Sequence, residues 1–439
     1  MSNAETTLDY LNAADEIAPP IPETIEDTGI SATVVESLIL KFLFYRGEML
    51  GRDLATALGL QFSVIQNLID SLKRAHAIQA KRSLSVGDTS TVFALSDTGR
   101  GLTREALEKN QYVGPVPVPL HQYSCVVRLQ RPPQGWLTRE ALLNAYRHMV
   151  ISNHVLAQIG PAVSSGNSLL IYGQPGNGKT FMAEAVQNIA SAAVYIPHAI
   201  ECQGNIVQVF DPLYHHPVEE KREVSVFHQN DETYDGRWQK CRRPFIVTGG
   251  ELTLETLDLS FNPASRVYDA PFQVKANNGI YLIDDFGRQR VSPAEVLNRW
   301  IVPMERRVDY LNFESGGKMT VPFEAFLIFS SNLKPDQLGD EAFLRRIQYK
   351  MLVRSPEEPE FLKIFRDFCE AKKLPVDPGT PERFVERFYR STGKPFRRCQ
   401  PRDVISHAID FINFERLPYK LTDEVLHSAF ESCFTSDVE

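Results

Sequence analysis

The sequence predicts an α/β fold built on a parallel sheet, with a small helical module before the sheet and a helical lid after it. From about residue 125, short β-rich apolar runs alternate with helical patterns, as they do when helices connect the strands of one sheet. A glycine-rich turn joins one of these runs to a helix at residues 173–180. From Pro356 onward the chain is helical and richly charged, which is typical of a small helical domain.

The composition supports packed domains and argues against a membrane-inserted or disulfide-bonded protein. The chain has 439 residues, 43% of them hydrophobic and 23% charged, which is enough apolar material for two or three cores. Because no apolar run approaches the roughly 20 residues of a membrane helix, we expect no membrane insertion. The six cysteines are scattered without a Cys-x-x-Cys pair, which indicates reduced thiols and a cytoplasmic location.

Residues 1–30 predict a disordered acidic arm. The arm contains three prolines and no basic residue, and seven acidic residues lie in it: Glu5, Asp9, Asp15, Glu16, Glu23, Glu26 and Asp27. Removing these seven from the 55 acidic residues leaves 48, against 47 basic residues. The remainder of the chain is therefore nearly neutral and gives no general argument for nucleic-acid binding.

Residues 31–110 predict a compact helical module that ends in a hairpin. Apolar residues repeat at helical spacing over 34–43 and 64–72, and a short helix is expected over 52–58 between them. Strand-like segments follow at 77–82 and 91–95, with a turn at 86–88. Helix, helix-turn-helix and hairpin in this order resemble the winged-helix fold.

Such a module could bind DNA, and the candidate side chains can be named. Lys73, Arg74, Lys81 and Arg82 could contact phosphates, while Gln61, Ser63, Gln66 and Asn67 could contact base edges. The alternatives are a solvated helix face or a module that docks onto protein. Residues 111–124 come next in the sequence, and we call them the Pro/Val strap. Alternating prolines at 115, 117 and 119 favour an extended interdomain segment here.

The strongest chemical signal is the glycine-rich turn at 173–180, which satisfies the pattern Gly-x4-Gly-Lys-Thr. An apolar run at 168–172 precedes it and a helical pattern at 181–189 follows it. In this motif the glycines let backbone N–H groups surround phosphate oxygens, the lysine reaches the β and γ phosphates, and the threonine hydroxyl binds Mg²⁺. We therefore expect an ATP site formed by Gly173, Pro175, Gly176, Asn177, Gly178, Lys179 and Thr180.

A second element supplies carboxylates. The apolar run 279–283 ends in Asp284 and Asp285, at the strand end where parallel sheets bind ligands. We expect Asp284 to hold Mg²⁺ together with Thr180, and Asp285 to act as the general base that polarises the attacking water.

Three further polar positions follow in a recognisable order. The apolar run 326–331 ends in Asn332, the segment 340–347 contains Arg345 and Arg346, and Arg402 lies near the start of a helix in the lid. With the glycine-rich turn, this order resembles the AAA+ superfamily of ATPases over residues 140–435. The resemblance implies a sensor 1 role for Asn332, an arginine finger at Arg345 or Arg346, and a sensor 2 role for Arg402.

Two details narrow the resemblance. Residues 272–279 are similar to the segment that precedes the acidic strand in MoxR-like, magnesium-chelatase-like and minichromosome-maintenance-like branches. Alternating residues over 308–313 and 319–323 predict a hairpin, similar to the pre-sensor-1 hairpin of those branches. The whole chain resembles a bacterial group described as predicted ATPases with chaperone activity, linked to Flp pilus assembly.

The chain also departs from that pattern. We expect the nucleotide-binding domain to span residues 125–355, with an unassigned insertion near 201–270, and the lid to span 356–439. Aspartate stands at 285, where many relatives carry the longer glutamate, so hydrolysis could be slow. No aromatic-hydrophobic-glycine pore loop is evident.

These features predict a magnesium-dependent ATPase with ATP and Mg²⁺ as its ligands. The resemblance implies a ring-shaped homo-oligomer, with six subunits as the expected number, that remodels an unidentified protein partner. One alternative is a DNA-associated ATPase that binds duplex DNA through residues 31–110. A second alternative is a nucleotide-dependent switch with little turnover.

Overall fold

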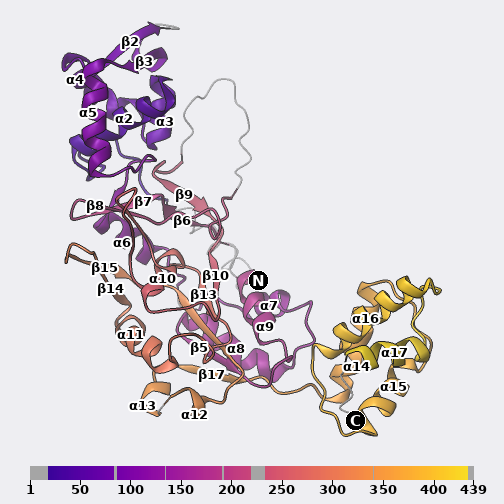
Figure 1. Cartoon of the computed structure of the whole chain (residues 1–439). Helices are drawn as coiled ribbons and strands as arrows, with labels where there is room; N and C mark the ends of the chain where they lie inside the picture. Colours follow the sequence, from indigo (N-terminus) through magenta and orange to yellow (C-terminus); the bar gives the residue numbers. More distant parts are fainter. Residues whose placement is uncertain are drawn as a thin grey trace, which may run out of the picture. The chain divides into compact units, whose positions relative to one another are not determined.

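The computed structural model describes residues 18–83, 87–133, 135–189, 192–218, 233–339 and 341–433 (Figure 1). The chain divides into two compact units. The first unit consists of residues 1–136, 190–282 and 290–327, and the second of residues 137–189, 283–289 and 328–439. No helix within the described ranges is both long enough and apolar enough to cross a bilayer.

The first unit begins with the predicted helical module. Its elements are α2 (Ala32–Arg46), β1 (Glu48–Leu50), α3 (Gly51–Leu58), α4 (Phe62–Arg74), β2 (Ile78–Ser83), β3 (Thr91–Leu95) and α5 (Asp97–Lys109). The three strands form an antiparallel sheet in the order β1-β3-β2. Gly59 ends α3 in the left-handed conformation, with φ 69°, which lets the chain turn directly into α4. The predicted helices and hairpin strands are therefore present; Val86 of the expected turn lies outside the described residues.

The Pro/Val strap is part of a folded sheet rather than a free linker. Val118–Pro119 forms β4, which pairs in parallel with Ile200 and Glu201 of β7 (Ala199–Cys202). The sheet order β11-β12-β8-β7-β4 places β4 at an edge, the position at which a strand tolerates proline. Val116 is fully buried in the core of the helical module, and its N–H donates to the Leu58 carbonyl at 2.8 Å.

The expectation of a disordered arm is wrong for residues 18–30, while residues 1–17 lie outside the described residues. Residues 24–29 form turns, and Pro19, Pro22 and Ile30 are buried. The Pro19 carbonyl accepts a hydrogen bond from the Asp235 N–H at 3.0 Å. The segment is ordered because its partners are supplied from the middle of the chain, which a local pattern cannot reveal.

The described residues of the expected insertion at 201–270 contain several short β-strands. Its strands, with the neighbouring ones, are β6 (Val194–Pro197), β7, β8 (Asn205–Gln208), β9 (Trp238–Cys241), β10 (Phe245–Thr248), β11 (Ser260–Asn262) and β12 (Val267–Asp269). Strand β6 pairs with β9, and β7 pairs with β8, both antiparallel. The core of the helical module continues into this sheet through Ala199, Ile206 and Val267.

The rest of the first unit contains the predicted hairpin. Strands β14 (Val308–Asn312) and β15 (Lys318–Pro322) pair antiparallel with Val308 opposite Pro322, so this prediction is confirmed. Its helices are α6 (Leu120–Leu129), α10 (Phe272–Lys275) and α11 (Pro293–Arg306). Helix α11 begins with a capping box between Ser292 and Glu295 and carries proline at its first position.

The predicted sheet has five strands in the order β10-β13-β16-β5-β17. These strands include β13 (Ile280–Ile283), β16 (Phe326–Ser331), β5 (Leu169–Tyr172) and β17 (Tyr349–Leu352). Both neighbours of β5 run parallel to it. Strand β10 belongs to this sheet, whereas β11 and β12 belong to the sheet of β7 and β8, so the region expected as one insertion at 201–270 is interrupted by a strand of the parallel sheet. Parallel pairing brings the residues that follow β5 and β16 to the same edge.

The second unit ends in the predicted helical region, with a core of its own. Its lid helices are α14 (Glu358–Ala371), α15 (Thr380–Val385) with a π-helical continuation (Glu386–Arg390), α16 (Gln400–Glu415) and α17 (Asp423–Cys433). Phe365, Phe384 and Phe430 pack together in its core. The second unit also contains α7 (Arg139–Ala145), α8 (Asn153–Ser165), α9 (Lys179–Ala185), α12 (Pro335–Leu338) and α13 (Glu341–Leu344). The predicted α/β fold with a parallel sheet and a helical C-terminal region is thus confirmed.

Candidate nucleotide site

The glycine-rich loop at 173–180 connects β5 to α9 in a conformation that requires glycine. Gly173, Gly176 and Gly178 have φ values of 145°, 78° and 79°, which side chains rarely permit. A Cβ atom on Gly173 would lie 2.4 Å from the Val353 carbonyl oxygen. Asn177 is 1% exposed, and its Oδ1 has no hydrogen-bond partner among the described residues. This oxygen is an acceptor, so a hydrogen-bond donor or a cation, and not a phosphate oxygen, would satisfy it.

Within the part of the chain that the structure describes, Lys179 is a buried cation whose hydrogen bonds all go to neutral oxygens. Its side chain is almost fully buried, and Nζ donates to the carbonyls of Gly173 at 3.0 Å and Gln174 at 3.2 Å. It also donates to Asn332 Oδ1 at 2.6 Å. Burial lowers the pKa of Lys179, and the nearby charges of Asp285 and Asp284 oppose that shift. Such an ammonium is favourably placed to receive an anion.

Asp284 and Thr180 form a pair of oxygen ligands directly beyond the ends of β13 and the loop. The Thr180 hydroxyl donates to Asp284 Oδ2 at 2.9 Å. The other carboxylate oxygen of Asp284 accepts from the Asp285 N–H at 3.0 Å. A hydroxyl and a carboxylate are ligands that Mg²⁺ prefers, so the residues fit this ion.

Asn332 links the lysine to the second aspartate. Its Nδ2 donates to Asp285 Oδ1 at 2.5 Å, while its Oδ1 accepts from Lys179. This bridge exists because β16, which Asn332 follows, lies between β5 and β13 in the sheet. Asp285 itself is held in the left-handed region at φ 48°, an uncommon conformation outside glycine. Lys179, Asn332 and Asp285 thus form one continuous chain of polar contacts.

These residues line a pocket of about 680 Å³, a size typical of small-molecule sites. The polar lining includes the glycine-rich loop, both aspartates and Asn332. The lining also includes apolar side chains, Met149, Val150, Phe181, Ile364 and Phe368, and the charged or polar residues His148, Asp367 and Arg398. Phe181 is 55% exposed, although it lies two residues after the buried Lys179.

The predicted arginines have different positions. Arg402 lines the pocket, but its side chain is 65% exposed and pairs with its neighbour Asp403 at 2.9 Å. Arg345 is exposed and Arg346 is half-buried, and neither lines this pocket within one chain. The structure therefore brings together every predicted site residue except these two arginines.

The sequence analysis missed two arginines at the start of α16. Arg398 also lines the pocket, where it donates to the Val150 carbonyl at 2.5 Å and pairs with Glu360 at 2.9 Å. Burial lowers the pKa of Arg398, and Glu360 opposes the shift. Arg397 donates to the Ser355 hydroxyl at 2.5 Å. The sequence did contain a signal for these residues, because two adjacent arginines lie four and five positions before the predicted Arg402.

Comparison with known proteins gives a local family match and distant structural similarities. Residues 357–432 match a family model described as a domain of unknown function, DUF8689. A search of curated proteins gives no match. NtrX from Brucella abortus in complex with ATP aligns with 66% of this chain and 57% of that chain, at 12% identity and a TM-score of 0.39.

A second solved structure aligns at similar distance. The RuvB Holliday junction branch migration motor from Thermotoga maritima aligns with 69% of this chain and 72% of that chain, at 13% identity and a TM-score of 0.35. Similarities at this distance do not assign a family, and this chain spans little more than half of the NtrX chain.

Proposed function

We propose that this pocket binds Mg-ATP and hydrolyses it, and that the chain is an ATPase of the AAA+ class. The observation that carries the proposal is the convergence of Lys179, Asn332 and both aspartates on one pocket beside a left-handed glycine loop. These are a cation for the phosphates, oxygen ligands for the metal, and a carboxylate next to an amide for the water.

Each residue of the pocket then has a role. The loop surrounds the triphosphate, and Lys179 exchanges its neutral oxygens for phosphate oxygens. Thr180 and Asp284 hold Mg²⁺, which neutralises charge on the phosphates when bound. The Asp285 carboxylate accepts a proton from the attacking water, which Asn332 orients. Because Asn332 already donates to Asp285, that hydrogen bond must loosen before Asp285 can accept the proton.

The apolar side chains of the pocket suit the nucleobase. Met149 and Val150 line the pocket, and Ile364 and Phe368 of α14 contribute from the lid. A planar aromatic ring gains from contact with such side chains, and Phe181 offers an exposed ring beside them. The lining therefore offers polar groups for phosphates and apolar side chains for a purine.

The proposal includes a ring-shaped homo-oligomer, expected to be a hexamer. Arg345 and Arg346 lie outside the pocket of their own chain, as expected of arginines that reach a neighbouring copy's nucleotide. Arg402 lines the pocket from the lid, as the sensor 2 role requires. We place Asn332, Arg402 and one of these two arginines in the catalytic machinery on this basis.

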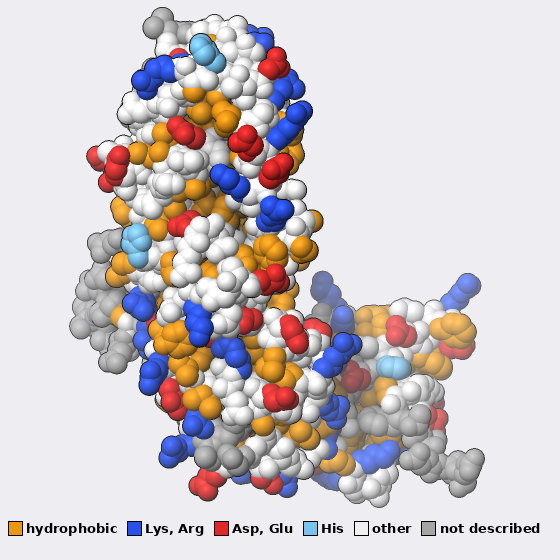
Figure 2. Space-filling view, turned by 60° about the vertical axis from the view of Figure 1, so that its left-hand side comes forward, with side chains coloured by type: hydrophobic (Ala, Val, Ile, Leu, Met, Phe, Trp, Pro, Cys, Tyr) orange, Lys and Arg blue, Asp and Glu red, His pale blue; other side chains and the backbone are white. Residues whose placement is uncertain are grey.

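We propose a protein rather than DNA as the remodelled partner. The helical module at 31–110 has the element order of a winged helix, but Lys73 is paired with Asp88 at 2.5 Å and with Asp70 at 3.3 Å. Basic and acidic side chains are interspersed over the face drawn in Figure 2. A phosphate-binding surface would instead need a concentration of free basic groups.

Phosphate release from Mg-ATP by the full chain, with and without duplex DNA, tests this proposal. We expect measurable turnover that DNA does not change. Salt-sensitive stimulation by DNA would favour the DNA-associated alternative instead. Tight ATP binding without turnover would favour the switch, which the shorter carboxylate at 285 permits. Absence of both binding and turnover would contradict the proposal.

A further inference from the structure

The start of lid helix α16 is in direct contact with the glycine-rich loop. The Cys399 N–H donates to the Gly176 carbonyl at 2.9 Å. A Cβ atom on Gly176 would lie only 2.7 Å from the Cys399 sulfur, so the two backbones approach closely. The glycine-rich loop and the lid are therefore in contact with each other without a ligand between them.

A second contact between the loop and the lid passes through Ser355. This residue lies between β17 and α14, in the segment that leads from the sheet into the lid. Its hydroxyl oxygen accepts from Arg397 Nη1 at 2.5 Å and from Asn177 Nδ2 at 3.4 Å. One side chain thus joins a loop residue to a lid residue.

The two hydrogen bonds of Ser355 differ in strength. The bond from Arg397 is short and charge-assisted, and such bonds are roughly twice as strong as neutral ones. The bond from Asn177 Nδ2 is long, at 3.4 Å. A phosphate oxygen in the loop would compete for this N–H donor and would therefore weaken the contact from Asn177 before the one from Arg397.

Arg398 makes a separate attachment. It joins the carbonyl of Val150, which lines the pocket, to Glu360 of α14. Neither of these contacts involves the loop or Ser355. Among the described residues, the path from Asn177 through Ser355 to Arg397 thus links the glycine-rich loop to the lid by side-chain hydrogen bonds.

We propose that Ser355 is a positioning residue that couples occupation of the glycine-rich loop to the position of the lid. This inference rests on the proposed function, because the occupant of the loop is a nucleotide phosphate. Phosphate in the loop moves the Asn177 amide, Ser355 carries the change, and Arg397 transmits it to the start of α16. Arg402, five residues further along, follows the same helix end into the pocket.

A double-mutant cycle on ATP affinity tests the coupling. Ser355→Ala removes the shared oxygen, so we expect ATP affinity to fall about 10-fold, as for loss of one hydrogen bond to a charged group. Arg397→Ala should have a similar effect. Because both act through one path, the double variant should lose about 10-fold rather than about 100-fold. Ser355→Thr keeps the hydroxyl and should restore affinity.

A matched control is available within the lid. The Ser391 hydroxyl bonds the Arg387 carbonyl oxygen and is exposed, so Ser391→Ala should leave ATP affinity unchanged. Additive losses in the double variant, or no loss in Ser355→Ala while the wild type binds ATP, would overturn the inference.

Hydrogen exchange without nucleotide separates this inference from the proposed function. In Ser355→Ala we expect the Cys399 amide, which donates to Gly176, to exchange about 10-fold faster than in the wild type. Faster exchange in a chain that fails to bind ATP would support the loop–lid coupling and contradict only the ATP proposal. Unchanged exchange would contradict the coupling, whatever the chain binds.

Discussion

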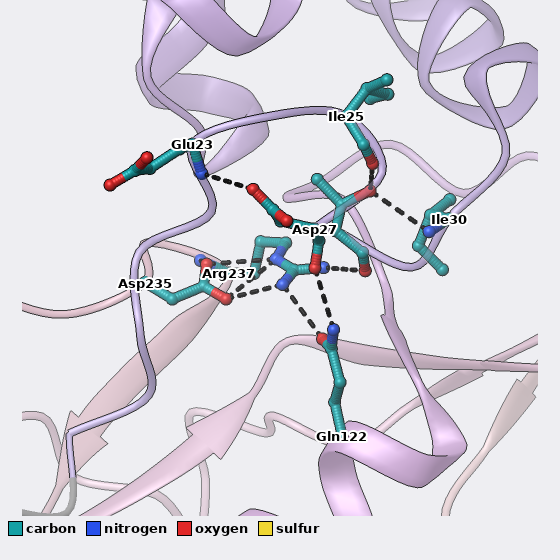
Figure 3. A network of polar contacts seen from close by, with 8 residues as sticks. Glu23, Ile25, Asp27, Ile30, Gln122, Asp235 and Arg237 are labelled. Carbon is teal, nitrogen blue, oxygen red and sulfur yellow. Dashed lines mark hydrogen bonds and ion pairs between the residues drawn. The ribbon is translucent and has the colours of Figure 1, made fainter.

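Two buried cations, one in each unit, have opposite surroundings. Arg237 in the first unit is 2% exposed, and Lys179 in the second is 6% exposed. Arg237 forms an ion pair with Asp235 at 2.7 Å and donates to the Thr28 carbonyl and to Gln122 Oε1 (Figure 3). Lys179 donates to neutral oxygens, those of Gly173, Gln174 and Asn332.

The difference separates a structural network from a ligand site. Arg237 has its counter-charge and hydrogen bonds within the fold, so a further anion would gain nothing there. Lys179 has hydrogen bonds but no carboxylate within ion-pair distance among the described residues, and it lines an open pocket. A buried charge without an ion-pair partner is costly even when opposite charges are nearby, and an incoming phosphate would reduce that cost.

The Arg237 network also explains why the first unit orders its N-terminal segment. Gln122 Nε2 donates to the Asp27 carbonyl at 3.0 Å, so α6, the turn at 235–237 and residues 27–28 meet at one point. Gly59 approaches the same turn, because a Cβ on it would lie 2.5 Å from the Gly236 oxygen. The network therefore fastens the N-terminal segment and the helical module to the sheet within this unit.

The largest expected effect is on ATP turnover, and it concerns the two arginines that the nucleotide pocket does not contain within one chain. If the site is completed by a neighbouring copy, Arg345→Ala combined with Arg346→Ala should reduce ATP turnover by about 10³-fold or more. ATP affinity should remain near that of the wild type, because neither arginine lines its own pocket. Steady-state phosphate release and equilibrium binding would measure the two quantities, and undiminished turnover would contradict the trans-acting role.

A smaller effect is expected at the closed network. Arg237→Ala leaves Asp235 buried at 1% exposure without its partner, so the free energy of unfolding should fall by roughly 3–5 kcal/mol. Urea denaturation would measure the loss. The double variant, Arg237→Ala combined with Asp235→Ala, should regain part of the lost stability, because it leaves no unpaired buried charge. A loss below about 1 kcal/mol would mean that Arg237 is not a structural centre.

Local patterns predicted the elements that carry their own signals. The run before Gly173, the strand ending at Asp284 and Asp285, and the strand ending at Asn332 all lie where periodicity and turn residues placed them. The lid helices and the hairpin were equally visible. Sequence order along a parallel sheet then sufficed to bring these residues to one edge.

The features that were missed depend on partners distant in sequence. Residues 18–30 are ordered by Arg237, and Val118 enters a sheet with Ile200, neither of which a window of residues can reveal. Strand β10 is short and lies within residues 201–270, for which the sequence patterns predict an insertion. Ser355 has no motif, since its role arises only from contact with Asn177 and Arg397.

Calorimetric titration of Mg-ATP into the full chain and its Lys179→Ala variant tests the central claim most directly. We predict that the wild type binds and that Lys179→Ala loses at least about 100-fold in affinity, because a buried cation that contacts phosphate oxygens is removed. Asp285→Asn is the matched control and should bind like the wild type while its turnover is lost. Equal ATP affinity in the wild type and in Lys179→Ala would contradict the phosphate role of this pocket.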